Sequence, residues 1–337
     1  MHLSTQLLYE HAEDCGEIRN PEVPPIYPAT AYILDDLDDY EYASNGGRYY
    51  YNRTANPNRD QLASAISHLE GGDKTLICSS GMAAISTVFF GLLRQGDHVL
   101  MSSAVYGETL ELAHHMLEKF GVEVSYADFT DLQQVQQGIR PNTRMVYTEI
   151  ISNPLTLVVD LDAISKLASE HHICVVVDST FTTPFVYRPL QHGADIVVHS
   201  LTKYFGGHSD ITGGSVTGSL ELIEKIRPGY LLLGCCLDPV SAWLTLRSLK
   251  TMEMRVGRQN ENAKALASML EKDPRVRAVF HPSLESHPQH ALAARVFTMG
   301  YGAMLSFRVE DSKEKVNAFI HRLRLILSLI HISEPTR

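Results

Sequence analysis

The chain has 337 residues, 44% of them hydrophobic and 20% charged, a composition typical of a globular protein too long for one compact core. Its formal charge of -10 at pH 7 argues against a nucleic-acid partner, because nonspecific binding to phosphates needs a basic face. No segment reaches the ~18 consecutive apolar residues of a membrane span, and the N-terminus carries acids where a signal peptide carries bases. We therefore predict a cytoplasmic protein without a membrane partner.

From about residue 58 onward, helical stretches alternate with short apolar runs. The runs predict strands over 75–80, 98–103, 123–128, 145–150, 174–179 and 196–202. Amphipathic stretches between them, most closed by Gly or a polar turn, predict helices. This alternation favours an α/β fold with a mostly parallel sheet covered by helices on both faces. Ligands of such sheets bind at the carboxyl ends of the strands.

After about residue 238 the pattern changes to long helical segments, over 238–273 and 287–300. Two strand-like runs, 276–282 and 303–310, interrupt the helical pattern. We therefore predict a large α/β domain over 58–237 and a smaller α+β domain over 238–326.

The five cysteines are an odd number without CxxC spacing, which disfavours a disulfide framework and a zinc site. We expect reduced thiols at Cys15, Cys78, Cys174, Cys235 and Cys236.

Two ionisable residues stand at the ends of apolar runs. Lys203 follows IVVHSLT, and Asp178 ends CVVVD. Taken alone, Lys203 fits a surface loop and Asp178 a helix cap. Together they fit pyridoxal phosphate, which needs a lysine at its aldehyde and an acid at its ring nitrogen. An acid that keeps this nitrogen protonated makes the ring an electron sink.

A phosphate-binding turn is predicted at CSSGMAAIS, where a strand ends and a helix begins. The backbone N–H groups of Gly81 and Met82 would face an anion with the helix dipole behind them. Ser200 and Thr202 could donate hydroxyl hydrogen bonds to the same phosphate. A strand, a glycine turn and a helix are a common combination, so the pattern is weak evidence by itself.

Six motifs carry a resemblance to a known family: YNRTANPNRDQLASAISHLEGG, CSSGMAAIS, VYGET, SNPL, VVVDSTFTTP and ADIVVHSLTKYFGGHSDITGG. In this order they resemble the pyridoxal-phosphate enzymes of cysteine and methionine metabolism, which include cystathionine γ-synthase, cystathionine lyases, methionine γ-lyase and O-acylhomoserine sulfhydrylases. The resemblance implies a fold-type-I transferase with a seven-stranded sheet. It also implies β- or γ-elimination, or γ-replacement, on cystathionine, an O-acylhomoserine or a related amino acid.

The resemblance assigns roles residue by residue. Lys203 would form the Schiff base with the cofactor and remove the Cα proton of the substrate. Asp178 would pair with the ring nitrogen. Tyr106, which could otherwise merely cap a helix, would stack on the ring and assist proton transfer. The other implied cofactor contacts are Gly81, Met82, Ser200 and Thr202 at the phosphate, and Asn153 and Thr180 near the ring.

A Tyr-x-Arg pair of the family reaches the phosphate from a neighbouring subunit, and here it matches Tyr51 and Arg53. A planar arginine fork suits a phosphate. The resemblance therefore implies a homotetramer, a dimer of dimers, whose N-terminal arm over 1–57 contributes to the partner's site. Without the resemblance, Tyr51 could be core packing and Arg53 a surface ion pair.

The sequence departs from the family pattern at three places. Glu108 stands where relatives carry a small residue and methionine γ-lyases a cysteine, and a carboxylate there would disfavour thiolate and thioether leaving groups. TEIISNP replaces the Ser/Thr-Pro that precedes the Asn-Pro turn in many relatives. The tail over 327–337 matches nothing in the family. We expect a non-native tail and an incomplete C-terminal domain that lacks the arginine for the substrate's α-carboxylate.

Two other functions compete with this prediction. A nicotinamide-dependent dehydrogenase is disfavoured because no GxGxxG follows the first strand. A truncated homologue could keep the fold and the cofactor yet turn over poorly. A metal site is disfavoured as well, because the spacing of His281, His287 and His290 fits no compact site, and we expect solvated loop residues there.

Overall fold

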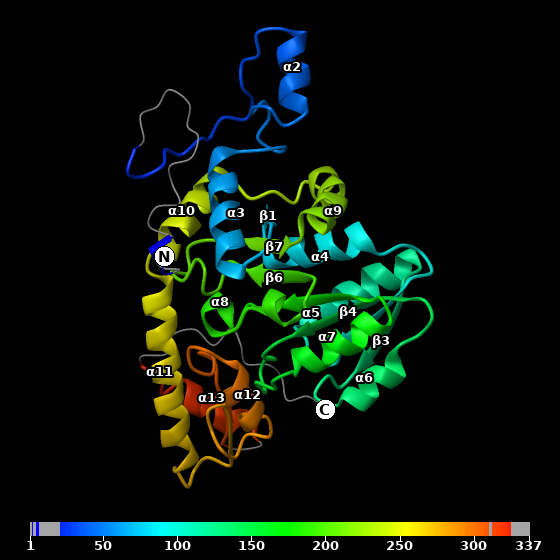
Figure 1. Ribbon diagram of the computed structural model, residues 1–337. Helices are drawn as coiled ribbons and strands as arrows, with labels where there is room; N and C mark the ends of the chain where they lie inside the picture. Colours follow the sequence, from blue (N-terminus) through cyan, green and yellow to red (C-terminus); the bar gives the residue numbers. More distant parts are fainter. Residues whose placement is uncertain (1, 3–4, 7–20, 310–311, 325–337) are drawn as a thin grey trace.

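The computed structural model describes residues 2, 5–6, 21–309 and 312–324. Its centre is a seven-stranded sheet in the order β1-β7-β6-β5-β4-β2-β3 (Figure 1). The strands are β1 (Lys74–Cys78), β2 (His98–Ser102), β3 (Glu123–Ala127), β4 (Thr143–Glu149), β5 (Cys174–Asp178), β6 (Ile196–Ser200) and β7 (Gly214–Gly218). Only β7 runs antiparallel to its neighbours, so the predicted mostly parallel sheet is confirmed.

The six strands predicted from apolar runs correspond to β1 to β6, within two residues at each end. The same reasoning misses β7, whose sequence GSVTG is short and begins and ends with glycine. Glycine weakens a strand pattern but permits close approach of another backbone. At Gly214 a Cβ atom would collide with the carbonyl group of Ser80. The close packing that requires glycine in β7 therefore also removes the apolar pattern by which a strand is predicted from sequence.

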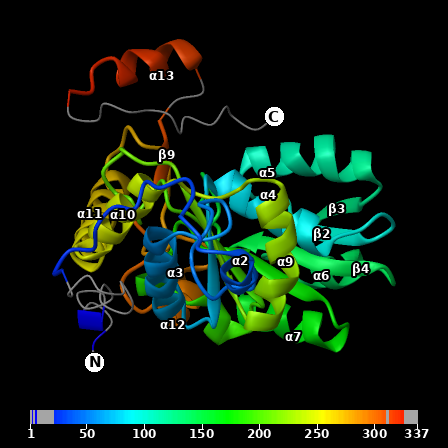
Figure 2. The ribbon, with the colours of Figure 1, turned by 90° about the horizontal axis from the view of Figure 1, so that it is seen from above.

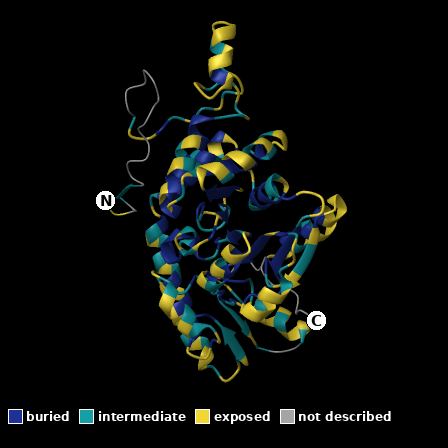
Figure 3. Ribbon diagram, turned by 45° about the vertical axis from the view of Figure 1, so that its right-hand side comes forward, coloured by how far each residue is buried: buried dark blue, intermediate teal, exposed yellow. Residues whose placement is uncertain are grey.

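Helices cover both faces of the sheet, and the strands between them are largely buried (Figure 3). On one face lie α4 (Gly81–Leu92), α9 (Leu220–Leu232) and α5 (Gly107–Leu112), which continues into a π turn over Ala113–Leu117 and a 3-10 turn over Glu118–Phe120. On the other face lie α6 (Leu132–Gly138), α7 (Leu161–Glu170), α3 (Pro57–Glu70), α8 (Thr183–Val186), the 3-10 helix Pro189–His192 and α10 (Pro239–Leu249).

The segment after α10 combines helices with a small second sheet. Its elements are α11 (Met252–Glu271), β8 (Ala278–Phe280), α12 (His290–Val296), β9 (Ser306–Arg308) and α13 (Lys313–Ile320). β8 and β9 pair antiparallel, which confirms both strand-like runs predicted in this part of the chain. In Figure 2, α13 stands apart from the other helices, and its Phe319 meets Phe307 of β9 edge to face at 6.1 Å.

The N-terminal segment leaves the body before α3, and its helix α2 (Leu37–Ser44) projects away from the sheet (Figure 1). Ile33 and Leu37 on this arm are 89% and 81% exposed. Clustered exposed aliphatic side chains mark a surface for a partner. Among the helices that the structure describes, none combines the length and apolar character that a bilayer crossing requires.

Candidate active site

The carboxyl ends of β4, β5 and β6 lie side by side, because these strands are parallel neighbours. Glu149, Asp178 and Ser200 are their last residues. The N-terminus of α4 approaches the same edge, where a Cβ atom on Gly81 would lie 2.9 Å from the Cβ of Ser200. The fold thus brings the predicted residues Asp178, Ser200 and Gly81 together at one edge of the sheet.

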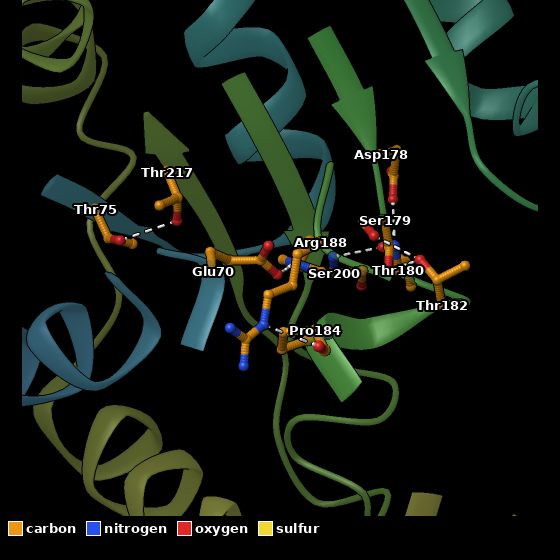
Figure 4. Close-up of polar contacts among 11 residues, drawn as sticks. Glu70, Thr75, Asp178, Ser179, Thr180, Thr182, Pro184, Arg188, Ser200 and Thr217 are labelled. Carbon is orange, nitrogen blue, oxygen red and sulfur yellow. Dashed lines mark hydrogen bonds and ion pairs between the residues drawn. The ribbon is translucent and has the colours of Figure 1, made fainter. Parts of the chain in front are cut away.

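Asp178 lies half-buried at this edge, where its Oδ1 accepts the Thr180 N–H at 2.9 Å (Figure 4). Burial raises the pKa of Asp178, while the hydrogen bonds from Thr180 and the charge of His199 lower it. The Tyr147 phenol adjoins the carboxyl without hydrogen-bond geometry. Within the described ranges no cation forms an ion pair with Asp178, so its carboxyl can receive a cationic N–H group.

Thr180 connects β5 to β6 through its side chain. It is 7% exposed, and its Oγ1 accepts the Ser200 N–H at 2.8 Å (Figure 4). The hydroxyl groups of Ser179 and Thr182 lie 2.5 Å apart and stabilise the same turn. These contacts hold Asp178 and Ser200 in fixed relative positions.

Lys203 lies in a tight turn directly after β6. Its N–H donates to the Ser200 carbonyl at 3.2 Å, and its own carbonyl accepts the Gly207 N–H at 2.8 Å. The residue is half-buried, and no carboxylate in the described part of the chain pairs with its amine. Lysine is rarely buried without a counter-ion. An amine in this position is suited to bond covalently to a carbonyl carbon.

The first turn of α4 offers unpaired backbone donors. Ser80 caps the helix by accepting the Ala83 N–H at 3.0 Å, whereas the N–H groups of Gly81 and Met82 have no acceptor among the described residues. These amides and the adjacent Ser200 hydroxyl can bind an anion. The Thr202 Oγ1 accepts the Gly213 N–H at 3.1 Å and donates to the Gly213 carbonyl at 3.4 Å, so this hydroxyl would have to give up the longer bond to donate to a phosphate.

Tyr106 stands at the N-cap position of α5, but its side chain makes no capping hydrogen bond and is 46% exposed. The alternative role as a helix cap is confirmed for the backbone, whose carbonyl accepts the Thr109 N–H at 2.9 Å, but the side chain takes no part in it. Its backbone N–H donates to Glu149 Oε1 at 2.6 Å, which joins the start of α5 to the end of β4.

Asn153 precedes a cis peptide bond to Pro154. Both residues line a cavity of about 480 Å³, together with Gln259 and Asn262 of α11 and with residues 303–306. Ser306 donates to the Pro154 carbonyl at 2.7 Å, so the chain at β9 supports this turn. Across the described ranges no hydrogen bond joins Asn153 to Asp178 or Lys203.

Tyr51 and Arg53 contact each other rather than the strand ends. The Arg53 guanidinium lies 5.5 Å from the centroid of the Tyr51 ring, and its Nη1 donates to the Leu231 carbonyl at 3.1 Å. Tyr51 is 38% exposed, so the alternative of core packing is wrong. Arg53 forms no ion pair in the described portion of the chain, where neither residue contacts Lys203. Their predicted role therefore requires a second chain.

The histidines expected to be solvated include two that are buried. His281 is 0% and His287 5% exposed. His281 bonds to the Ser283 hydroxyl at 2.7 Å and the Gly302 carbonyl at 3.2 Å. The prediction was wrong because neutral imidazoles that bond backbone carbonyls and hydroxyls can be buried as packing groups. Within the described residues, no three His, Cys, Asp or Glu side chains gather as a metal site would need.

Sequence reasoning also misses two buried polar features near this edge. His199 Nε2 lies 2.5 Å from Glu70 Oε1, and both side chains are 0% exposed. Glu149 is 5% exposed beside Asp178. The signal that singled out Asp178, an acid at the end of an apolar run, is equally present in MVYTEI and could have identified Glu149.

The residues at this edge fit pyridoxal phosphate. The Asp178 carboxyl suits a protonated pyridine nitrogen, the Lys203 amine suits the aldehyde, and the amides of Gly81 and Met82 suit the phosphate. Among the described residues, these groups make no other hydrogen bond or ion pair through the atoms that would contact the cofactor. The one exception is Asp178 Oδ1, which accepts the Thr180 N–H.

Comparison with known proteins identifies the family. The family of Cys/Met metabolism PLP-dependent enzymes matches residues 4–332. The canavanine γ-lyase of Pseudomonas canavaninivorans is 37% identical over 335 residues, which cover 98% of this chain and 84% of that protein. The L-methionine γ-lyase of Fusobacterium nucleatum subsp. polymorphum is 39% identical over 320 residues, 94% of this chain and 81% of that protein. A crystal structure of cystathionine γ-synthase from Xanthomonas oryzae pv. oryzae has a TM-score of 0.89 at 34% identity, covering 96% of this chain and 82% of that one.

These relatives are enzymes, so a homologue without catalytic function is not favoured. The tail predicted to be non-native lies outside the described residues, and the family match includes its residues 327–332. The match, the fold and the residues at the sheet edge agree: the chain belongs to the Cys/Met metabolism PLP-dependent enzyme family, the lyases and transferases of sulfur amino acid metabolism that use pyridoxal phosphate.

Proposed function

We propose that this enzyme acts at the γ-carbon of an amino acid, by γ-elimination or γ-replacement of a leaving group. The three relatives support this proposal, since each is named for a γ reaction. The observation that carries the cofactor site on which this reaction depends is the position of Asp178 and Lys203 beside the free amides of α4 at one sheet edge. Pyridoxal phosphate supplies an electron-withdrawing ring that acidifies the Cα proton of a bound amino acid.

In this proposal, the Lys203 amine holds the cofactor and its Nζ moves the Cα proton. Asp178 accepts a hydrogen bond from the ring N–H and keeps that nitrogen protonated. The exposed Tyr106 ring covers one face of the site, and its phenol O–H is available for proton transfer. The remaining proposed contacts are Gly81, Met82, Ser200 and Thr202 at the phosphate, and Asn153 and Thr180 near the ring.

We further propose that Glu108 selects the leaving group. Its side chain is exposed in the first turn of α5, two residues after Tyr106. A carboxylate there repels a departing thiolate and gives no favourable contact to an apolar thioether. It would pair with a guanidino group such as that of canavanine, for which one relative is named. The proposed substrate class is therefore an amino acid with a polar or cationic γ-substituent.

We propose a homotetramer, a dimer of dimers, in which Tyr51 and Arg53 complete the phosphate site of the partner. The exposed apolar arm supports this assembly, as does the Arg53 guanidinium, which pairs with no carboxylate among the residues that the structure describes. In this arrangement 1–57 serves as the arm, 58–237 as the cofactor domain and 238–326 as the C-terminal domain. We also propose a cytoplasmic location, which is supported by free thiols at all four cysteines of the described ranges.

The first test is the visible spectrum of the enzyme purified with pyridoxal phosphate. We expect a yellow band that borohydride bleaches, with the cofactor then fixed to the peptide that contains Lys203. Lys203→Ala should lose the band, whereas Lys166→Ala, at an exposed position of α7, should keep it. A band that survives Lys203→Ala, with the label on another lysine, would contradict the proposal.

A further inference from the structure

Glu149 occupies an unusual position for a carboxyl group. It ends β4 directly beside Asp178, its register partner on β5, and is 5% exposed. Its Oε1 accepts the Tyr106 N–H at 2.6 Å. Its Oε2 is buried and has no hydrogen-bond partner among the described residues. One oxygen thus accepts a single backbone hydrogen bond, and the other accepts none from the described residues.

This arrangement is costly for an ionised Glu149. A buried carboxylate oxygen without a partner loses its hydration and receives nothing in return. A second negative charge on the neighbouring Asp178 would add repulsion. Burial accordingly raises the pKa of Glu149 well above its ordinary range, and the charge of Asp178 raises it further, while the Tyr106 N–H lowers it.

Of the two carboxyls, Asp178 ionises first, because of the groups that surround each of them. Asp178 is half-buried and accepts the Thr180 N–H, and the charge of His199 from β6 lowers its pKa. From the part of the chain that the structure describes, the Glu149 carboxyl receives only the N–H of Tyr106. The Tyr147 phenol, from β4 itself, adjoins both acids and stays neutral because burial raises its pKa.

We propose that Glu149 functions as a neutral carboxylic acid, a positioning residue that links Tyr106 to Asp178. Its carbonyl oxygen holds the backbone of Tyr106, and its lack of charge leaves Asp178 as the single carboxylate of the pair. Asp178 is then free to pair with a cationic ring nitrogen without a competing anion beside it. This inference rests on the proposed cofactor site, but the protonation of Glu149 can be tested without the cofactor.

The first experiment compares Glu149→Gln with the wild type in cofactor-free protein, by urea unfolding between pH 5 and 8. A carboxyl whose folded pKa is raised binds a proton that the unfolded chain releases above pH ~4.5. Stability therefore falls as pH rises from that value towards the folded pKa. Gln cannot titrate, so the unfolding midpoint of Glu149→Gln should fall less steeply with pH. Glu285→Gln, at an exposed position, should follow the wild type.

The second experiment measures the affinity for pyridoxal phosphate by absorbance titration. The amide of Gln matches the acceptor and donor of a neutral carboxylic acid, so Glu149→Gln should bind within about threefold of the wild type. Glu149→Ala removes the acceptor of the Tyr106 N–H and should bind about tenfold more weakly, the loss expected for one hydrogen bond to a buried group.

Each outcome bears on one proposal. The inference is overturned if the unfolding midpoints of Glu149→Gln and the wild type change with pH in parallel. It is also overturned if Glu149→Gln and Glu149→Ala lose equal affinity for the cofactor, since the charged form of Glu149 would then be required. If the wild type itself binds no cofactor, the proposed function fails. The pH profiles of the cofactor-free protein still decide whether Glu149 is neutral in that case.

Discussion

Glu108 and Glu149 show how burial separates two acids that look alike in the sequence. Glu108 is exposed in the first turn of α5, where it is free to interact with a ligand. Glu149 is buried with one oxygen on the Tyr106 amide. In the proposed roles, Glu108 acts from the solvent-exposed surface and Glu149 from within the fold. Only the exposed one can repel a leaving group by its charge.

The role of Glu108 predicts a change of substrate preference. Glu108→Ala should raise kcat/KM for methionine relative to canavanine by about tenfold, because one unfavourable charge contact of about 1.4 kcal/mol is removed. Steady-state assays with both amino acids measure this ratio. Glu111→Ala, which removes an exposed acid one turn further along α5, should leave it unchanged. Equal ratios in Glu108→Ala and the wild type would refute a role in leaving-group selection.

At the scale of elements, the site depends on how closely α4 begins beside β6 and β7. Gly81 faces Ser200 of β6, and Gly214 of β7 lies against the carbonyl group of Ser80. Both contacts are too close for a Cβ atom. The free amides of α4 can therefore reach an anion at the strand ends only because glycine stands at both positions.

Gly214→Ala should weaken cofactor binding although residue 214 is not proposed to touch the cofactor. The added methyl group must displace the backbone at Ser80 and with it the first turn of α4. Loss of one phosphate contact would lower the affinity for pyridoxal phosphate about tenfold or more, measured by absorbance titration. Gly229→Ala in α9, whose Cβ would lie no closer than 3.9 Å to Gly91, is the matched control and should bind normally. Normal binding in Gly214→Ala would mean that the phosphate lies elsewhere.

At the scale of the whole molecule, one chain holds Tyr51 and Arg53 away from the other predicted cofactor contacts. Arg53 instead bonds to the Leu231 carbonyl, and the arm around α2 exposes Ile33 and Leu37. An exposed apolar surface on a projecting arm fits the proposed second copy of the chain, since symmetric homo-oligomers are the commonest assemblies.

Shared sites predict complementation between inactive variants. In an oligomer built from one variant alone, Arg53→Ala or Lys203→Ala damages every site. A mixed dimer, however, has one site with both native residues. Co-refolding equal amounts should therefore restore about one quarter of wild-type activity, because about half of the dimers are mixed and one of their two sites is intact. A mixture of Asp178→Asn with Lys203→Ala should restore nothing, since both residues come from the same chain. Absence of activity in the first mixture would place Arg53 outside the neighbouring site.

The predictable features were those with a local sequence signal. Asp178 and Ser200 end apolar strands that are parallel neighbours, so parallel pairing brings them to one edge. Gly81 opens a helix after β1 and reaches this edge only because β7 pairs antiparallel with both β1 and β6. The burial of His281 and His287 was not predictable in this way, because it depends on carbonyl and hydroxyl partners such as Gly302, which is 21 residues away from His281. The pair of His199 and Glu70 is separated by 129 residues and likewise carries no local signal.

The sequence by itself therefore determined the α/β class, six of the seven strands, the family and the residues proposed to hold the cofactor, because periodicity, glycine turns and ordered motifs are local properties of the chain. Only the tertiary structure decided that β7 lies antiparallel between β1 and β6, that Glu149 is buried beside Asp178, and that Tyr106 is exposed. These features depend on desolvation and on contacts between distant segments, and such quantities exist only once the chain is folded.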